Sequence, residues 1–279
     1  MNYKTCIITG ATDGIGKATA LELARQGYHI GFSSRNEEKG LRVQKELIEA
    51  SGNEHIQMFQ CDLASLKEVK QFAENVLNAY PHIDLLINNA GVLETTRKHS
   101  KDGFELTWAV NYLAHFYLTN LLVLRLEASA PARIINLSSV AYRFASMRFD
   151  DLECKNFFNP IQIYGQSKLA VMIFTHALAE KIDGTGVTVN CLHPGVVNTA
   201  IIRQLGWIGS WFMESFALTP ERGAETTLYL ATSADVKGVS GQYFIDKKPQ
   251  DLRRDVLDAK IAAKLWEISE EMVGEQFPI

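Results

Sequence analysis

A tyrosine and a lysine that could move a proton lie four positions apart, at Tyr164 and Lys168. In a helix this spacing places both side chains on one face. A free tyrosine has a pKa near 10, which is too high for efficient proton transfer at neutral pH. An ammonium group about 5 Å away would favour the phenolate by roughly 3 kcal/mol at an effective dielectric constant near 20. The pair could therefore give a proton to a carbonyl oxygen or take one from an alcohol, although the same spacing occurs on many helices without any function.

A glycine-rich turn lies between the first expected strand and the first expected helix. A pyrophosphate can approach the backbone at Gly14, and the helix N-terminus supplies N–H groups and the positive end of a dipole. The glycine spacing differs from the G-x-G-x-x-G pattern, so an ordinary turn is the alternative. We expect a dinucleotide to bind here, through the following residues of the turn: Gly10, Thr12, Asp13, Gly14, Ile15 and Gly16.

The end of the second expected strand indicates which dinucleotide is bound. A carboxylate at this position would contact a ribose hydroxyl and favour NAD. The chain has Ser34 and then Arg35 instead. An arginine fork can donate two charge-assisted hydrogen bonds to a phosphate. We therefore predict NADP(H), with a plain surface arginine as the alternative.

Polar residues follow several other expected strands. Ser139 comes after the strand 133–137, where it could polarise a carbonyl or merely cap a helix. Asn111 lies in an otherwise apolar helical stretch, so its amide must bind an ordered water or serve as a structural link. Asp62, followed by Leu63, could accept from an adenine amino group or cap the next helix.

Short apolar runs alternate with helix-period segments along the whole chain, which indicates βαβ units and a parallel sheet. We predict an α/β fold: a single-domain, Rossmann-type, doubly wound parallel seven-stranded sheet with helices on both faces, spanning residues 1–279. The expected strands are 6–8, 29–33, 56–60, 85–87, 133–137, 187–192 and 242–245. The expected helices are 15–26, 37–50, 66–80, 103–126, 164–181 and 252–274.

The composition is that of an ordinary globular protein, with 47% hydrophobic and 22% charged residues among 279. The net charge of −4 argues against a nucleic-acid partner. Four cysteines without a Cys-x-x-Cys motif are expected to be buried thiols, and we expect no metal site. The polar start and the lack of a long apolar run predict no signal peptide, no transmembrane anchor and a cytoplasmic location.

The joint motif set resembles that of the short-chain dehydrogenase/reductase superfamily, over roughly residues 4 to 245. Within it the chain is most similar to the retinol-dehydrogenase-like group, whose membrane-bound members carry an N-terminal anchor. Asp13 departs from this pattern, because many relatives have a neutral or basic residue there. The resemblance rests on the following motifs, in order: Thr-Gly-x-x-x-Gly-x-Gly at 9–16, Ser34-Arg35, Asn88-Asn89-Ala90-Gly91, Asn111, Ser139, Tyr164-x-x-x-Lys168, His193-Pro194-Gly195 and Lys264-Leu265-Trp266.

This resemblance implies a role for each matching residue. Tyr164 would be the general acid/base, and Lys168 would lower its pKa and bind the nicotinamide ribose. Ser139 would orient the substrate oxygen, and Asn111 would hold a proton-relay water. Further cofactor contacts are implied at Asn89, Ala90, Gly91, Tyr164, Lys168, Pro194, Gly195, Val197 and Thr199.

Two aromatic-rich segments, about 142–163 and 204–218, follow strand ends and are expected to cover the substrate. Packing on the sheet, on a second subunit of a homodimer or on a membrane surface is the alternative for 204–218. We predict an NADPH-dependent enzyme that interconverts a carbonyl and an alcohol on an apolar small molecule. A C=C reductase and a low-turnover nucleotide-binding scaffold or sensor are the competing hypotheses.

Overall fold

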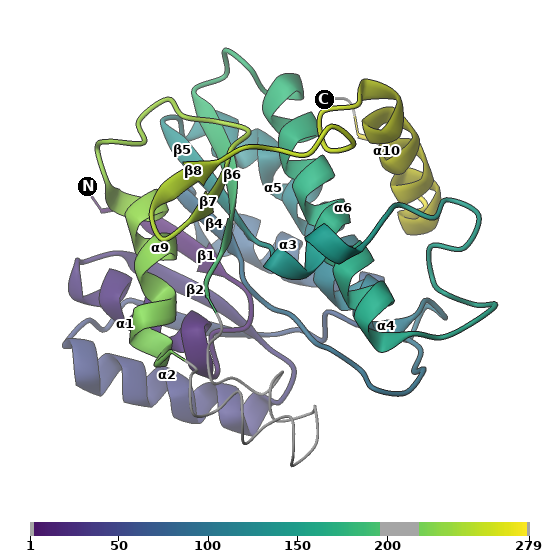
Figure 1. Cartoon of the computed structure of the whole chain (residues 1–279). Coiled ribbons are helices and arrows are strands. Elements are labelled where there is room, and N and C mark those ends of the chain that lie inside the picture. The colour runs from purple at the N-terminus through teal and green to yellow at the C-terminus, as the bar shows by residue number, and fades with distance from the viewer. Residues whose placement is uncertain (1–2, 196–217, 278–279) are drawn as a thin grey trace.

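The computed structural model describes residues 3–195 and 218–277. Their strands form a sheet in the order β3-β2-β1-β4-β5-β6-β7-β8, in which the first seven strands pair in parallel (Figure 1). The predicted doubly wound parallel sheet is therefore confirmed. The strands are β1 (Thr5–Ile8), β2 (His29–Ser34), β3 (Ile56–Gln60), β4 (Leu85–Asn88), β5 (Ala132–Leu137), β6 (Val187–His193), β7 (Tyr243–Ile245) and β8 (Lys248–Gln250).

The sheet has eight strands in the described residues, where the sequence predicts seven. The extra strand, β8, pairs antiparallel with β7 and forms the sheet edge. Asp246 and Lys247 join the two strands with positive φ angles of 49° and 63°, the backbone that a two-residue hairpin turn requires. Because β8 has only three residues and contains Pro249, it has no alternating pattern that would reveal it.

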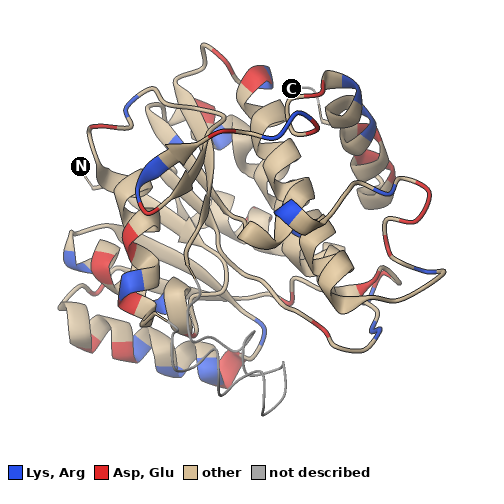
Figure 2. Ribbon diagram, viewed as in Figure 1, with Lys and Arg blue, Asp and Glu red and all other residues tan. Residues whose placement is uncertain are grey.

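Helices cover both faces of the sheet (Figure 1). One face carries α1 (Gly14–Arg25), α2 (Glu37–Ser51) and α9 (Pro220–Thr232), and the other carries α3 (Leu66–Ala79), α5 (Ala114–Ala128), α6 (Pro160–Lys181) and α10 (Ala259–Val273). Each face has its own cluster of buried apolar side chains. Charged residues lie mainly on the outer helices and loops, while the central strands are almost free of them (Figure 2).

The helix that carries Tyr164 begins one turn earlier than the sequence predicts. Its N-cap is Asn159, whose Oδ1 accepts from Ile161 N at 3.0 Å and from Gln162 N at 3.1 Å. Pro160 occupies the first helical position, where the missing N–H costs nothing. The extra turn places Tyr164 inside a regular helix rather than at its fraying end.

The long helix predicted over 103–126 is divided into three parts. These are α4 (Leu106–Trp108), a π-helical turn η1 (Ala109–Leu113) and α5. The N–H of Ala114 donates to the carbonyl of Ala109, which is the wider π-helical spacing. Single π turns within helices are often found at functional sites. Asn111 lies in the middle of this turn.

The strand order reverses between β1 and β4, the point at which such sheets bind ligands. The carboxyl ends of β1, β4, β5 and β6 meet at this edge. They bring together the glycine turn, residues 88–91, Ser139 and the end of β6. None of the helices in the described ranges is long and apolar enough to cross a membrane, and all four cysteines are buried free thiols.

Candidate active site

Three of the predicted catalytic residues lie together beyond the end of β5. Tyr164 is half-buried on α6, and Lys168 lies one turn further along the same face with 3% of its surface exposed. The Lys168 Nζ atom is 5.8 Å from the centroid of the Tyr164 ring. The Ser139 side chain hydrogen-bonds to Tyr164. The structure thus places a cation and a hydroxyl group near the acid/base candidate.

Burial sets the electrostatics of this trio. It raises the pKa of Tyr164, and the hydrogen bond with Ser139 acts in the opposite direction. Burial also lowers the pKa of Lys168 to about 8. The sequence predicts that Lys168 lowers the pKa of Tyr164, whereas in the structure burial has the largest effect on this pKa and raises it. The Lys168 ammonium group is itself removed from water and donates to the Leu137 carbonyl at 2.9 Å.

Close packing holds α6 against the end of β5. Ser138 donates its hydroxyl to the Lys168 carbonyl at 2.9 Å. A Cβ on Gly165 would lie only 2.8 Å from the Ala141 carbonyl oxygen, so only glycine lets the short helix η2 (Val140–Phe144) approach so closely. Ser139 is the N-cap of η2 and accepts from Ala141 N at 3.3 Å. Ser139 therefore caps a helix and also contacts Tyr164.

The Asn111 side chain links two segments of the site. Its Oδ1 accepts from Val92 N at 2.7 Å, and its Nδ2 donates to the Val92 carbonyl at 2.9 Å and to Ser167 Oγ at 3.1 Å. The amide is fully buried, and these contacts engage its oxygen and its nitrogen. The side chain therefore serves as a structural link between these segments.

The glycine turn packs closely against Asn89 and Ala90, which follow β4. Asn89 Nδ2 donates to the carbonyls of Thr9 and Gly10, at 2.8 Å and 3.1 Å. Gly10 has a φ of +69°, and a Cβ on it would lie 2.9 Å from Ala90 Cα. A Cβ on Gly16 would lie 2.4 Å from both Asn89 Nδ2 and the Gly10 oxygen. The first turn of α1 follows directly, so its N–H groups face the same edge, which fits the pyrophosphate of a dinucleotide.

The other residues of the turn lie at its rim. Asp13 is the exposed N-cap of α1 and accepts from Gly14 N at 2.8 Å. Thr12 and Gly14 are partly exposed, Gly14 has a φ of +54°, and Ile15 is buried in the core. Ala90 and Gly91, partly exposed, face this rim from the end of β4.

The residues expected to contact the adenosine end lie after β2 and β3. Ser34 is buried and donates its hydroxyl to the Asn36 carbonyl at 2.7 Å, while Arg35 is exposed. Asp62 Oδ1 accepts from Ala64 N at 3.1 Å, and Leu63 is buried beside it. The N-cap of α3 is Ser65 rather than Asp62. Arg35 is thus the side chain of this group that is most open to a ligand.

The segments expected to cover the substrate are described in part. Pro194 and Gly195 are partly exposed beyond β6, whereas Val197, Thr199 and residues 204–217 lie outside the described residues. In 142–163, Gln166 on α6 anchors the loop by accepting from Arg148 N at 3.0 Å and donating to the Leu152 carbonyl at 2.6 Å. Tyr142 and Cys154 are buried there, and Phe144 and Phe157 are 85% and 74% exposed. The segment is therefore part core and part exposed apolar surface.

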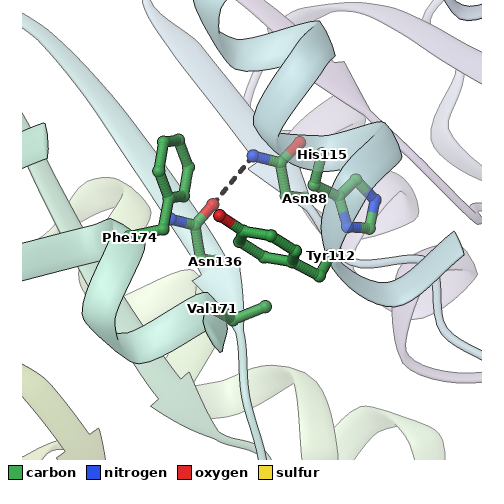
Figure 3. Close-up of a pocket in the computed structure, with 6 residues that line it drawn as sticks. All are labelled: Asn88, Tyr112, His115, Asn136, Val171 and Phe174. Carbon is green, nitrogen blue, oxygen red and sulfur yellow. Dashed lines mark hydrogen bonds between the residues drawn. The ribbon is translucent and has the colours of Figure 1, made fainter. Parts of the chain in front are cut away.

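A group of buried polar contacts behind the site is missed by the sequence reasoning, although Thr9 and Asn88 belong to motifs that it names. Asn88 Nδ2 donates to Asn136 Oδ1 and to Thr119 Oγ1, both at 2.8 Å, while His115 contacts Thr9 and Asn111. The histidine follows Asn111 by four positions in an apolar helical run, which is the one sequence signal for it. Figure 3 shows the residues that line a small pocket here: Asn88, Tyr112, His115, Asn136, Val171 and Phe174.

Comparison with known proteins gives a consistent assignment. Residues 4–206 match a family model described as short chain dehydrogenase. The chain is 42% identical over 293 residues to mouse (Mus musculus) retinol dehydrogenase 14, covering 98% of this chain and 87% of that protein. It is 42% identical over 284 residues to human (Homo sapiens) retinol dehydrogenase 13, covering 99% and 86%.

Solved structures show the same fold. An uncharacterised protein from Mycobacterium paratuberculosis superposes with a TM-score of 0.80 at 29% identity, covering 99% of this chain and 95% of that one. A metagenomic short-chain oxidoreductase in complex with NADP superposes with a TM-score of 0.63 at 27% identity, covering 83% and 92%.

Proposed function

The chain belongs to the short-chain dehydrogenase family, and we propose that it is an NADP(H)-dependent oxidoreductase that interconverts a carbonyl and an alcohol on an apolar small molecule. The observation that carries this proposal is the Tyr164–Lys168–Ser139 arrangement at the sheet edge that also holds the glycine turn. Neither the phenol nor the buried ammonium is needed to stabilise a nucleotide-binding scaffold, and burying an ammonium group costs free energy.

A bound nicotinamide dinucleotide supplies or accepts the hydride. The residues of the chain handle the proton and the oxygen. Ser139 donates a hydrogen bond to the substrate oxygen, and Tyr164 gives that oxygen its proton in reduction or removes it in oxidation. Lys168, held by the Leu137 carbonyl at 2.9 Å, provides the positive charge that stabilises the phenolate left after proton transfer.

Arg35 supports NADP(H) over NAD(H). Its side chain is exposed after β2, and no ion-pair partner of it occurs within residues 3–195 and 218–277. The buried Ser34 beside it carries no negative charge that would repel a phosphate. The solved relative that contains NADP is consistent with this choice.

The substrate is proposed to be apolar for two reasons. Phe144 and Phe157 expose large rings on the loop that precedes Tyr164. The relatives at 42% identity are named retinol dehydrogenases, and retinol is an apolar alcohol.

The proposed function is tested by assaying the purified protein on a panel of apolar aldehydes, ketones and alcohols. NADPH and NADH are compared at equal concentration, and product identity is checked by mass spectrometry. We expect NADPH-dependent conversion of a carbonyl to an alcohol. Conversion of a C=C bond alone, or tight NADPH binding with no turnover on any substrate, would contradict the proposal.

A further inference from the structure

A buried histidine connects the two halves of the site. His115 lies on α5 and is 3% exposed. Its Nε2 atom is 2.9 Å from Thr9 Oγ1 in the glycine turn, and its Nδ1 atom is 3.2 Å from the Asn111 carbonyl oxygen in the π-helical turn. One ring therefore bridges the expected dinucleotide turn and the segment that supports the catalytic helix.

The hydrogen bonds around Thr9 determine which nitrogen of His115 carries the proton. Thr9 Oγ1 accepts from Asn89 N and from Ala90 N, both at 3.0 Å. A hydroxyl oxygen that accepts two hydrogen bonds has its own proton left to donate. Thr9 thus donates to His115 Nε2, so the proton of the neutral ring is on Nδ1 and is donated to the Asn111 carbonyl.

The environment keeps this ring neutral. Burial, followed by the positive charge of Lys168, lowers the pKa of His115 to about 3. A charged ring would also have to donate from Nε2, where Thr9 already donates. Only one tautomer of one charge state satisfies every partner, and a network with a single arrangement restricts the positions of its members.

The network continues from Asn111 to the catalytic helix. Asn111 Nδ2 donates to Ser167 Oγ at 3.1 Å, and Ser167 donates its hydroxyl to the Tyr164 carbonyl at 2.8 Å. Ser167 directly precedes Lys168 in α6. At the other end, Asn89 donates its main-chain N–H to Thr9 Oγ1. Its side-chain Nδ2 donates to the Gly10 carbonyl at 3.1 Å. The hydrogen-bonded path therefore runs from the glycine turn to the backbone of Tyr164.

We propose that His115 is a positioning residue that acts through both of its ring nitrogens: the Nε2 contact holds Thr9 and the glycine turn in the shape that binds NADPH, and the Nδ1 contact holds Asn111 and thereby the Tyr164–Lys168 pair. The catalytic half of this inference, which concerns Asn111 and the Tyr164–Lys168 pair, rests on the proposed function. The binding half, which concerns Thr9 and NADPH, rests on the glycine turn alone.

The two ring contacts can be separated by substitution. His115→Asn places an amide N–H near the position of Nδ1. It therefore keeps the donation to the Asn111 carbonyl and loses the contact with Thr9. His115→Gln reaches further, so it contacts Thr9 and loses the donation to Asn111. His115→Phe loses both. His176→Asn is the matched control, because His176 lies further along α6, where its Nε2 is 3.7 Å from Glu180.

Two readouts are measured on folded protein: the NADPH dissociation constant by fluorescence titration, and the pH midpoint of kcat. His115→Asn should weaken NADPH about five- to tenfold and leave the pH midpoint unchanged. His115→Gln should retain NADPH affinity within twofold and shift the midpoint. His115→Phe should weaken NADPH binding and also shift the midpoint. His176→Asn should change neither the NADPH dissociation constant nor the pH midpoint. A role in stability alone would lower the melting temperature and move neither readout, which would overturn the inference.

A second set of variants can overturn the binding half even if the histidine variants do not fold. Thr9→Ser keeps the hydroxyl and should bind NADPH as the wild type does, whereas Thr9→Val should bind it at least fivefold more weakly. If both proteins fold, Thr9→Val combined with His115→Asn should be no worse than Thr9→Val alone, because Thr9→Val already removes the Thr9–His115 contact along with the hydrogen bonds from Asn89 N and Ala90 N. Additive losses in the double variant, or wild-type affinity in Thr9→Val, would overturn the inference. A wild type that binds NADPH and turns over no substrate would refute the proposed function, and these binding results would still decide the role of His115.

Discussion

The Nζ atom of Lys168 lies 5.8 Å from the Tyr164 ring centroid and donates a hydrogen bond to the Leu137 carbonyl, 2.9 Å away. The ammonium group is therefore held beside the phenol by the end of β5 and by its own position one turn along α6. Because burial lowers the pKa of Lys168 to about 8, its charge is lost within the range in which enzymes are assayed. This relationship makes the proposed chemistry sensitive to moderately alkaline pH.

The pH dependence of reduction should reveal this titration. Lys168 is charged below a pH of about 8 and becomes neutral above it, so it stops stabilising the phenolate left by proton transfer. We expect kcat for carbonyl reduction to fall as pH rises through about 8. In Lys168→Arg the charge persists, so whatever activity remains should show no such fall. A fall near pH 8 that is unchanged in Lys168→Arg would assign it to another group.

The coenzyme preference should depend on Arg35. In Arg35→Asp the proposed cationic partner of the ribose phosphate is replaced by a repelling carboxylate. We expect NADPH to bind about ten- to a hundredfold more weakly, with NADH unaffected or improved. Arg25→Asp, at the far end of α1, is the matched control and should change neither dissociation constant. Persistence of the NADPH preference in Arg35→Asp would refute the assignment.

The glycine turn can be tested by comparing two left-handed glycines. Gly10 and Gly27 have φ angles of +69° and +84°, so alanine is strained at both, at a cost of about 1–2 kcal/mol. Only at Gly10 would the new Cβ meet backbone, 2.9 Å from Ala90 Cα, whereas Gly27 has no neighbour within 4 Å. We expect Gly10→Ala to lose about 1–3 kcal/mol more unfolding free energy, and to lose NADPH affinity as well. Chemical denaturation and NADPH titration measure the two effects, and equal losses in both variants would count against a crowded turn.

Stability at acid pH should depend on the buried His115 and the partly buried His193. Burial lowers the pKa of His193 to about 4 and that of His115 to about 3, from an ordinary value of 6.5 that applies after unfolding. Between these pKa values and 6.5, the two histidines are protonated in the unfolded chain but neutral in the folded chain. Stability is therefore complete above about pH 6.5 and falls as pH decreases toward 4 and 3. Each histidine adds up to about 1.4 kcal/mol per pH unit to this slope.

His193→Gln tests that expectation directly. The free energy of unfolding is measured by urea denaturation between pH 4 and 7, and the variant should lose a large part of the His193 contribution to the slope. His99→Gln, on an exposed residue, is the control and should keep the slope of the wild type. An identical slope in His193→Gln and the wild type would show that His193 does not control acid stability.

Much of the fold follows from the sequence because strand and helix periods are local. The runs that become β1 to β7, and Gly27 as the residue that ends the first helix, are visible without coordinates. The hairpin strand β8 is not visible, because Lys248–Gln250 is too short to show a period. The π-helical turn at Asn111 is also hidden, since its hydrogen-bond spacing depends on packing rather than on residue type.

For the candidate site, too, some residues are predicted from the sequence and others are not. Tyr164, Lys168 and Ser139 are predicted because their types and order suggest chemistry. His115 is not, because its partner Thr9 lies 106 positions away and only the folded sheet brings them together. The hydrogen bond from Lys168 to the Leu137 carbonyl is likewise not predicted, because no spacing rule places that carbonyl beside the lysine.

The proton donor is the central claim, and Tyr164→Phe tests it most directly. This variant keeps the ring and removes only the hydroxyl group that Ser139 contacts. We predict NADPH binding within about twofold of the wild type and a fall in kcat for carbonyl reduction of at least about a hundredfold. Wild-type turnover in Tyr164→Phe, with NADPH still bound, would contradict the account.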